Sequence, residues 1–238
     1  MNIWKKYYQD AIPWYLARHY WWAYLWKFGV WFFDHQWIIN TILFGKYSSL
    51  MSHCLQALSR QEPGRVLQLT CVYGNLTRHL YRIVKDDLHI ADIADIQLKA
   101  AIKKMPAPQH HCYFERMNAE RLGFQNNAFD TVLLFFLLHE VTPEARERVL
   151  QESLRVLKTN GRLIIVEYAE FGDRHPFHKF ALFRSVLGKL EPFLPGFWHE
   201  SLAQKVELAA SRQKRTVNAF NSELLFNGFY RVVEIVIG

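Results

Sequence analysis

The sequence predicts an α/β protein with a doubly wound, mostly parallel sheet of the Rossmann type. From residue 61 onward, short apolar runs alternate with helical segments, which is the pattern of parallel strands joined by helices. The first apolar run is followed by a loop and then a helix, the order in which such sheets hold a nucleotide beyond the carboxyl ends of their strands. The 238 residues are enough for one substantial core.

The elements of this sheet follow one another in a regular order. The fourth helix is expected to end in a turn at Gly161, because glycine commonly follows the last helical residue. A turn at 227–231 leads into a closing strand at 232–237. The other predicted strands are 65–69, 88–93, 111–116, 129–136 and 162–168. The predicted helices are 76–84, 97–105, a single turn at 119–122, and 143–157.

Residues 1–60 are predicted to form a helical extension to the domain at 61–238. Seven of the eight tryptophans precede residue 38, and apolar side chains occur all round the expected helices rather than on one face. One interpretation is a helical cap packed on the main domain. The other is a surface that faces a membrane, since Trp and Tyr beside basic residues are typical of the membrane–water interface.

The net charge of +7 lies entirely in the two flanks, because residues 61–170 hold equal numbers of acidic and basic side chains. Basic flanks favour an anionic membrane surface or nucleic acid. Nucleic acid is the weaker interpretation, since the basic residues are diluted among aromatic ones. The uncharged stretch at 36–45 is far shorter than the roughly 20 residues of a membrane span, and no signal-peptide layout is present. Three scattered cysteines indicate a reducing compartment.

Residues 171–220 interrupt the predicted sheet with three prolines around an amphipathic stretch at 177–190. Basic side chains alternate there with Phe, Val and Leu, as in helices that lie on a membrane surface. The segment is predicted to be a lid or a membrane-facing helix. A surface helix over the core is the alternative.

The loop after the first strand departs from the usual nucleotide-binding pattern. That pattern has an acid followed by glycines at alternate positions, because only glycine lets backbone amides approach a cofactor closely. Here Gln68 replaces the acid, and Thr70 and Val72 replace two glycines. Gly74 remains, and Tyr73 adds bulk beside it. The strand, loop and helix keep their usual order, but side chains replace the glycines that would contact the cofactor. This indicates that the chemistry is altered or lost.

Two further segments are predicted to hold a nucleoside. Asp92 and Ile93 end the second strand, where an acid accepts hydrogen bonds from ribose hydroxyls. A helix N-cap is the alternative role for Asp92. Asn118 and Ala119 occupy the segment that would frame an adenine ring, with the Asn118 amide available to its exocyclic amine.

Candidate reacting groups follow the fourth and fifth strands. His139 and Glu140 come directly after Phe136 and its neighbours, and Glu167 ends the fifth strand. A histidine with two carboxylates could bind a cation such as Mn or Mg. The spacing contains no compact ligand motif, and a polar cap on the next helix is the alternative role for His139.

With these residues in view, the chain resembles the rhodoquinone-biosynthesis family RquA, a divergent relative of the quinone methyltransferases. The resemblance implies a Rossmann-like class I methyltransferase fold. Asn75 stands where the family often has Asp, and Glu167-Tyr168 where it often has Asp-Tyr, which weakens a metal role for Glu167. The stretches that carry the resemblance are 19–24 with 32–40, Cys71-Val72-Tyr73-Gly74-Asn75, and 135–140 with 154–157 and 165–168.

The resemblance implies a peripheral enzyme at the cytoplasmic face of the inner membrane that converts ubiquinone to rhodoquinone. S-adenosylmethionine would donate the amino group that replaces a ring methoxy group, with help from Mn²⁺. Tyr73, His139 and Glu140 are then the candidate catalytic residues, and the candidate quinone-binding residues are Tyr20, Trp21, Trp22, Tyr24 and Trp37. The alternatives are a conventional S-adenosylmethionine-dependent quinone methyltransferase and a non-catalytic quinone-binding scaffold.

Overall fold

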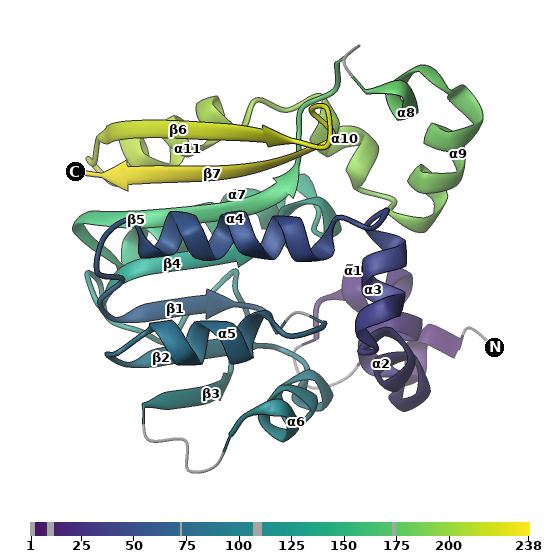
Figure 1. Cartoon of the computed structure of the whole chain (residues 1–238), viewed down its shortest axis with the longest axis horizontal. Coiled ribbons are helices and arrows are strands. Elements are labelled where there is room, and N and C mark those ends of the chain that lie inside the picture. Colours follow the sequence, from purple (N-terminus) through teal and green to yellow (C-terminus); the bar gives the residue numbers. More distant parts are fainter. Residues whose placement is uncertain (1–2, 9–11, 72, 107–110, 173–174) are drawn as a thin grey trace.

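The computed structural model describes residues 3–8, 12–71, 73–106, 111–172 and 175–238. Its strands are β1 (Val66–Leu69), β2 (Leu88–Asp92), β3 (Cys112–Arg116), β4 (Phe129–Phe135), β5 (Leu157–Tyr168), β6 (Val217–Leu225) and β7 (Tyr230–Ile237). They form one sheet in the order β3-β2-β1-β4-β5-β7-β6 (Figure 1). The first five strands pair in parallel, while β7 runs antiparallel to β5 and β6. The predicted doubly wound, mostly parallel sheet is confirmed.

Helices cover both faces of the sheet, which explains why its central strands are apolar runs. The helices concerned are α4 (Tyr47–Ser59), α5 (Leu76–Ile83), α6 (Asp95–Lys104), α7 (Pro143–Val156) and α11 (Leu202–Arg212). α4 and α5 lie together in front of the sheet in Figure 1, and α7 and α11 pack against each other behind it. Every residue of β1 and β2 is buried as a result, as expected of parallel strands covered on both sides.

Two local predictions are wrong. Residues 118–121 form a turn closed by a bridge between Asn118 and Arg121, and not a helical turn. The fourth predicted helix ends at Val156 and β5 begins at once, so Gly161 lies inside the strand. Asn160, with φ of 61°, takes the left-handed conformation expected of the glycine. β6 escaped prediction because most of its side chains are exposed or half-buried.

The N-terminal elements lie beyond the carboxyl ends of the parallel strands (Figure 1). They are the single turn η1 (Ile3–Lys6), α1 (Trp14–His19), the π-helical η2 (Trp21–Leu25), α2 (Lys27–Phe33) and α3 (Gln36–Ile42). α4 belongs to the core, because five of its residues, including Tyr47 and Cys54, are buried against the sheet and its neighbours. Residues 12–42 therefore cover the end of the sheet where ligands bind in this fold.

The segment at 171–220 divides into two parts. Its first helices are α8 (Pro176–Lys179), α9 (Ala181–Leu190) and α10 (Leu194–Trp198), and the first two stand at the same end of the sheet as the N-terminal elements (Figure 1). The second part is α11, packed on α7, and the start of β6. The predicted lid therefore corresponds to α8 and α9 alone, since α11 and β6 belong to the main domain. Among the described residues, no helix has the length and apolar character needed to cross a membrane.

Candidate functional site

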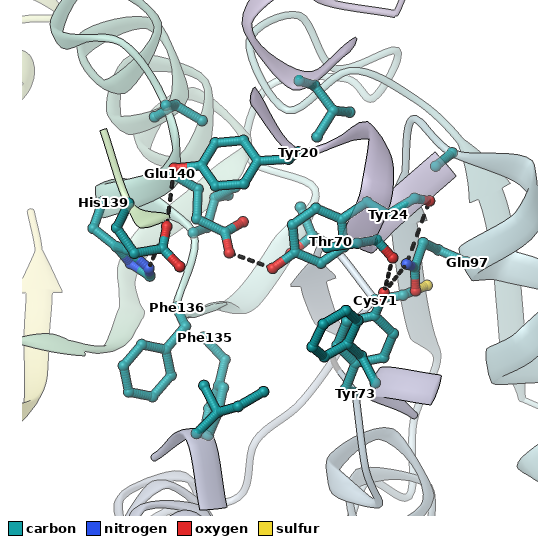
Figure 2. A pocket seen from close by; sticks show the side chains of 18 of the residues that line it. Tyr20, Tyr24, Thr70, Cys71, Tyr73, Gln97, Phe135, Phe136, His139 and Glu140 are labelled. Atoms are coloured by element: carbon teal, nitrogen blue, oxygen red, sulfur yellow. Dashed lines mark hydrogen bonds and ion pairs between the residues drawn. The ribbon is translucent and has the colours of Figure 1, made fainter. Parts of the chain in front are cut away.

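A cavity of about 660 Å³ lies beyond the carboxyl ends of β1, β2 and β4. The loops after these strands form one side, and the N-terminal elements and α9 form the other (Figure 2). The volume is in the range of sites for small organic molecules, about 300–1,000 Å³. Most lining side chains are apolar or aromatic, and three of the titratable ones, His139, Glu140 and Glu191, lie close together.

Thr70 and Tyr73, from the loop after β1, line the cavity as predicted. Thr70 has a φ of 66°, in the left-handed region that favours glycine, so the loop keeps a glycine-like turn while presenting a side chain. The Tyr73 hydroxyl donates to the Ala23 carbonyl and accepts from Gln97 Nε2 at 2.9 Å. These bonds tie the loop to η2 and α6. Val72 lies outside the described residues.

The sequence predicts that Gln68 contacts a cofactor, but its side chain does not line the cavity. The side chain is fully buried. Its Nε2 donates to the Thr70 carbonyl at 2.9 Å, and its Oε1 accepts from Thr77 Oγ1 at 3.0 Å. Through these two hydrogen bonds, Gln68 fixes the conformation of the loop after β1.

Gly74 also stays out of the cavity, because side chains of this chain fill the space beside it. The Tyr47 hydroxyl accepts from the backbone N–H groups of Asn75 and Leu76, at 2.9 and 3.2 Å. Asp34 Oδ1 accepts from the Gly74 N–H at 3.3 Å. A Cβ on Gly74 would lie 2.5 Å from the Tyr47 hydroxyl. The start of α5, an anion site in many nucleotide-binding folds, is occupied by the protein itself.

The four residues predicted to hold a nucleoside line the cavity together: Asp92, Ile93, Asn118 and Ala119. Both Asp92 carboxylate oxygens accept backbone hydrogen bonds, from Cys71 at 2.7 Å and from Ala94 at 2.8 Å. Burial raises the pKa of Asp92 to about 6, and these hydrogen bonds oppose the rise. Ala94 is the N-cap residue of α6, so Asp92 does not take the alternative capping role. Asp92 instead links the loop after β1 to the loop after β2 at the cavity wall.

The predicted quinone-binding aromatics separate into two groups. Tyr20, Trp22 and Tyr24 line the cavity. Trp21 instead stacks on Tyr7, with ring centroids 5.3 Å apart, and Trp37 is 67% exposed. The prediction is therefore wrong for Trp21 and Trp37 as cavity residues, because the π-helical turn of η2 and the exposed face of α3 direct them away from it.

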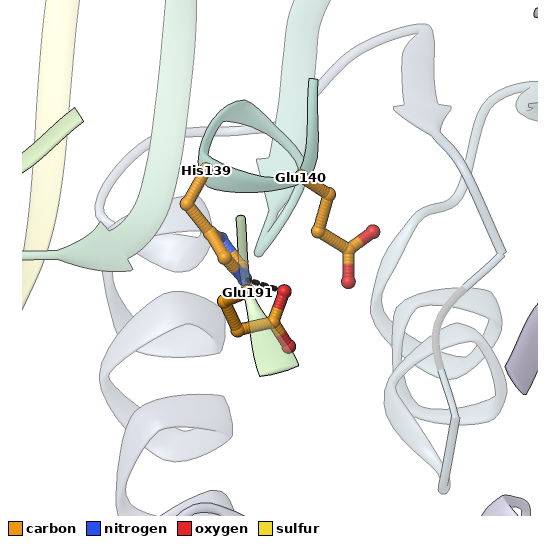
Figure 3. A group of neighbouring side chains, drawn as sticks. All are labelled: His139, Glu140 and Glu191. Atoms are coloured by element: carbon orange, nitrogen blue, oxygen red, sulfur yellow. Dashed lines mark ion pairs between the residues drawn. The ribbon is translucent and has the colours of Figure 1, made fainter. Parts of the chain in front are cut away.

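His139, Glu140 and Glu191 form a compact cluster in the cavity wall (Figure 3). One ligand-type atom from each lies within 4.8 Å of the others. His139 and Glu140 come from η3 (Leu138–Glu140), the short turn after β4, while Glu191 is the residue that follows α9. The Tyr24 hydroxyl donates to Glu140, and the Tyr20 hydroxyl donates to Glu191 at 3.0 Å. Phe136 lies edge-on to the His139 ring.

Glu167, one of the predicted metal ligands, lies outside this cluster. Its Oε1 lies 2.7 Å from His139 Nδ1. Its Oε2 accepts from the backbone N–H groups of Leu138 and His139, at 3.0 and 3.3 Å. Glu167 thus orients the imidazole from behind, and His139 Nε2 faces Glu191 Oε2 at 3.9 Å.

The acid–base properties of the cluster follow from its burial. Burial alone would lower the pKa of His139, but the Glu167 carboxylate outweighs it and raises that pKa to about 9. Burial raises the pKa of Glu140 to about 8, against the opposing effect of His139. Burial likewise raises the pKa of Glu191. Three carboxylates beside one imidazole are therefore stable here only when they share protons or bind a cation.

Sequence reasoning missed two residues that complete the site. Glu191 is the one acid between Lys179 and Pro192, and its place at the end of an amphipathic helix was a usable signal. Gln97 sits on α6, where a helical glutamine gives no sign that its amide bonds the Tyr73 hydroxyl. Tyr24 connects the two regions, because it donates to Glu140 while its ring stacks on Tyr73 at 5.6 Å (Figure 2).

Residues 66–161 match the family described as methyltransferase domain. Among curated proteins, the chain is 34% identical over 141 residues to the ubiquinone/menaquinone biosynthesis C-methyltransferase UbiE of Ectopseudomonas mendocina, covering 57% of this chain and 54% of that protein. It is 31% identical over 163 residues to UbiE of Azotobacter vinelandii, covering 64% of this chain and 63% of that protein. The chain thus spans between half and two thirds of the length of these relatives.

Solved structures match over more of the chain. The PH0226 protein of Pyrococcus horikoshii superimposes with a TM-score of 0.58 at 16% identity, covering 86% of this chain and 93% of that one. Magnesium protoporphyrin IX methyltransferase of Synechocystis, crystallised with bound SAH, gives 0.56 at 18% identity, covering 79% and 81%. At such identities the likeness concerns the fold. The chain therefore has the Rossmann-like fold of class I methyltransferases, and residues 66–161 are similar to the methyltransferase-domain family.

Proposed function

We propose that this protein is an S-adenosylmethionine-dependent transferase that acts on a ubiquinone-type ring and replaces a methoxy group with an amino group. The observation that carries the proposal is the position of Tyr24. It contacts Tyr73 of the rebuilt cofactor loop and Glu140 of the cluster, so both regions face one cavity. A donor held by the loop would present its reactive end to the cluster.

The nucleoside of the donor would lie against Asp92, Ile93, Asn118 and Ala119. Its methionine part cannot use the start of α5, since Asp34 and Tyr47 occupy those N–H groups. Thr70 and Tyr73 further narrow that side of the cavity. We infer that the methionine part turns toward Tyr24 and Glu140, which would place its α-amine, rather than its methyl group, near the cluster.

Amine attack requires removal of a proton, because the α-amine is protonated in free solution. Glu140 lies at the side of the cavity toward which the amine would turn, and in its ionised form it can accept that proton. In the bond exchange, a carbon–nitrogen bond forms at the ring carbon, the carbon–oxygen bond to the methoxy group breaks, and methoxide takes up a proton from the attacking amine and leaves as methanol. The bond between this nitrogen and the α-carbon of the donor must then be hydrolysed, with water giving a hydroxyl group to the carbon and a hydrogen to the nitrogen, to release the aminoquinone.

His139, Glu140 and Glu191 fit a divalent cation such as Mn²⁺, because one nitrogen and two carboxylate donors converge within 4.8 Å. When bound, the cation would supply positive charge that polarises a quinone oxygen. Tyr20 and Tyr24 hold the two carboxylates, and Glu167 holds the imidazole. The ligand set proposed here thus contains Glu191 in place of Glu167.

The quinone would enter from a membrane surface. Trp31, Trp37 and Phe180 are each about 60% exposed or more, and they lie on or next to α2, α3 and α9, at the same end of the sheet as the cavity. Apolar residues of α9 such as Leu190 both line the cavity and reach solvent. A peripheral position on the cytoplasmic face of the inner membrane would let a long-tailed quinone slide in beside α9.

A conventional C-methyl transfer to a quinone ring is the second candidate, and the relatives favour it because they bear the name C-methyltransferase. A product mass separates the possibilities. The purified protein is incubated with S-adenosylmethionine, Mn²⁺ and a short-tailed ubiquinone. We expect an aminoquinone with loss of methanol. A methylated quinone would replace this proposal with methyl transfer, and unchanged but bound quinone would indicate a scaffold.

A further inference from the structure

The cluster of His139, Glu140 and Glu191 joins the turn after β4 to the end of α9. His139 and Glu140 belong to η3, which is fixed to the sheet by β4 and by the Glu167 hydrogen bonds. Glu191 comes from the lid, directly after α9 (Figure 3). The cluster is therefore complete only while the end of α9 stays against the sheet.

The packing of α9 itself is shallow. None of its ten residues is buried, and Leu182, Val186 and Leu190 are 79%, 50% and 54% exposed. Phe183 packs on Phe177 and Phe44 at its start. After its end, Phe193 packs on Tyr20 and Leu194 is buried. The polar contacts of Glu191 with Tyr20 and His139 add to this packing at the cavity wall.

The charges of the carboxylates around His139 determine how strongly the end of α9 is held at the cavity wall. Glu140, Glu167 and Glu191 lie around one imidazole, so negative charges on these carboxylates repel one another in a site where water screens poorly. A divalent cation turns this repulsion into attraction between Glu191 and η3. Each ligand is already oriented from outside the cluster, by Tyr20, Tyr24 or Glu167, as in protein sites that hold metal ions firmly.

We propose that His139, Glu140 and Glu191 bind one divalent transition-metal cation, and that this cation latches α9 over the cavity. The inference rests on the proposed function in taking this cavity as the active site, and it is independent of which group is transferred. α9 forms one wall of the cavity through Val186, Leu187 and Leu190. Cation binding would then close the site around a quinone whose tail leaves between the exposed apolar residues of α9 and α3.

The test measures cation binding and α9 dynamics on the intact chain. Mn²⁺ binding is followed by electron paramagnetic resonance, and backbone hydrogen exchange of residues 180–192 is followed by mass spectrometry with and without MnCl₂. We expect Mn²⁺ to slow that exchange at least tenfold in the wild type. Glu191→Gln should weaken Mn²⁺ binding at least tenfold and abolish the slowing. The control Glu207→Gln, an exposed residue on α11 of the same segment, should behave as wild type.

Two outcomes overturn the latch: unchanged exchange of 180–192 on Mn²⁺ binding, or wild-type Mn²⁺ affinity in Glu191→Gln. A thermal melt checks that Glu191→Gln is folded, and Tyr20→Phe, which loses only the outer hydrogen bond, should give an intermediate affinity. The latch and the amino transfer can be rejected independently of each other. A methylated product from a protein with a working latch rejects amino transfer alone, while an aminoquinone made without any change in α9 rejects the latch alone.

Discussion

Tyr24 donates its hydroxyl hydrogen to Glu140 while its ring stacks on Tyr73, so one side chain spans the cofactor loop and the cluster. The Tyr24 hydrogen bond favours the ionised form of Glu140 and partly opposes the effect of burial on its pKa. Removing the hydroxyl should therefore raise the pKa of Glu140 further above 8.

Tyr24→Phe keeps the ring stack and deletes that hydrogen bond. We expect kcat at pH 7 to fall by less than the roughly hundredfold to ten-thousandfold that general-base catalysis supplies, because Glu140 itself is retained. The acid limb of the pH–rate profile should move to higher pH, because more Glu140 is protonated. Tyr113→Phe, on exposed β3, is the control. If kcat falls equally at every pH and the acid limb of the profile stays at the same pH, the result would argue against Glu140 as the base.

Cation affinity should depend on pH. In the cation-free protein the pKa of His139 is about 9 and that of Glu140 about 8, so both hold protons at pH 7. A cation must displace these protons. Mn²⁺ affinity should therefore rise between pH 7 and pH 9, with proton release seen by calorimetry in buffers of different ionisation enthalpy. An affinity that is flat over this range would show that His139 and Glu140 do not bind the cation.

Glu167 should matter for stability as well as for the cation. Glu167→Gln turns an acceptor oxygen into an N–H₂ group that faces either His139 or backbone donors. A mismatch of this kind, fully buried, costs about 1–3 kcal/mol of unfolding free energy. Chemical denaturation should show that loss, and Mn²⁺ affinity should drop by about 10–100-fold. Glu191→Gln, at the half-buried end of the lid, should lower stability far less.

The close approach at Gly74 can be tested with a matched pair of variants. Gly74 and Gly45 both have positive φ, 84° and 75°, so alanine is strained at either position. A Cβ at Gly74 would also meet the Tyr47 hydroxyl at 2.5 Å, whereas nothing lies within 4 Å at Gly45. Gly74→Ala should be more destabilising than Gly45→Ala by about 1–3 kcal/mol. Equal losses would mean that Tyr47 moves aside freely.

Membrane binding should depend on the exposed tryptophans and much less on the half-buried ones. Trp31 and Trp37 are 59% and 67% exposed, whereas Trp21 and Trp22 are partly covered. The double variant Trp31→Ala with Trp37→Ala should lose most of its binding to anionic liposomes in a flotation assay. Tyr113→Ala, exposed on the far edge of the sheet, should bind as wild type. Undiminished flotation of the double variant would place the membrane contact elsewhere.

The sequence by itself determined the sheet, because parallel strands covered on both faces must be apolar runs joined by helices. It also placed His139, Glu140, Asp92 and Asn118 at the cavity, since strand ends meet at one edge of such a sheet. It could not place Trp21 or Trp37, whose directions depend on the π-helical turn and on which face of α3 is covered.

Only the tertiary structure decided the makeup of the cluster. Glu167 and Glu191 are both acids near the same end of the sheet, and the sequence favoured the first. In the fold, Glu167 accepts hydrogen bonds from η3 and lies behind His139, while the packing of α9 brings Glu191 to the front. That choice depends on contacts between residues 28 or more positions apart along the chain, where local pattern and spacing carry no information.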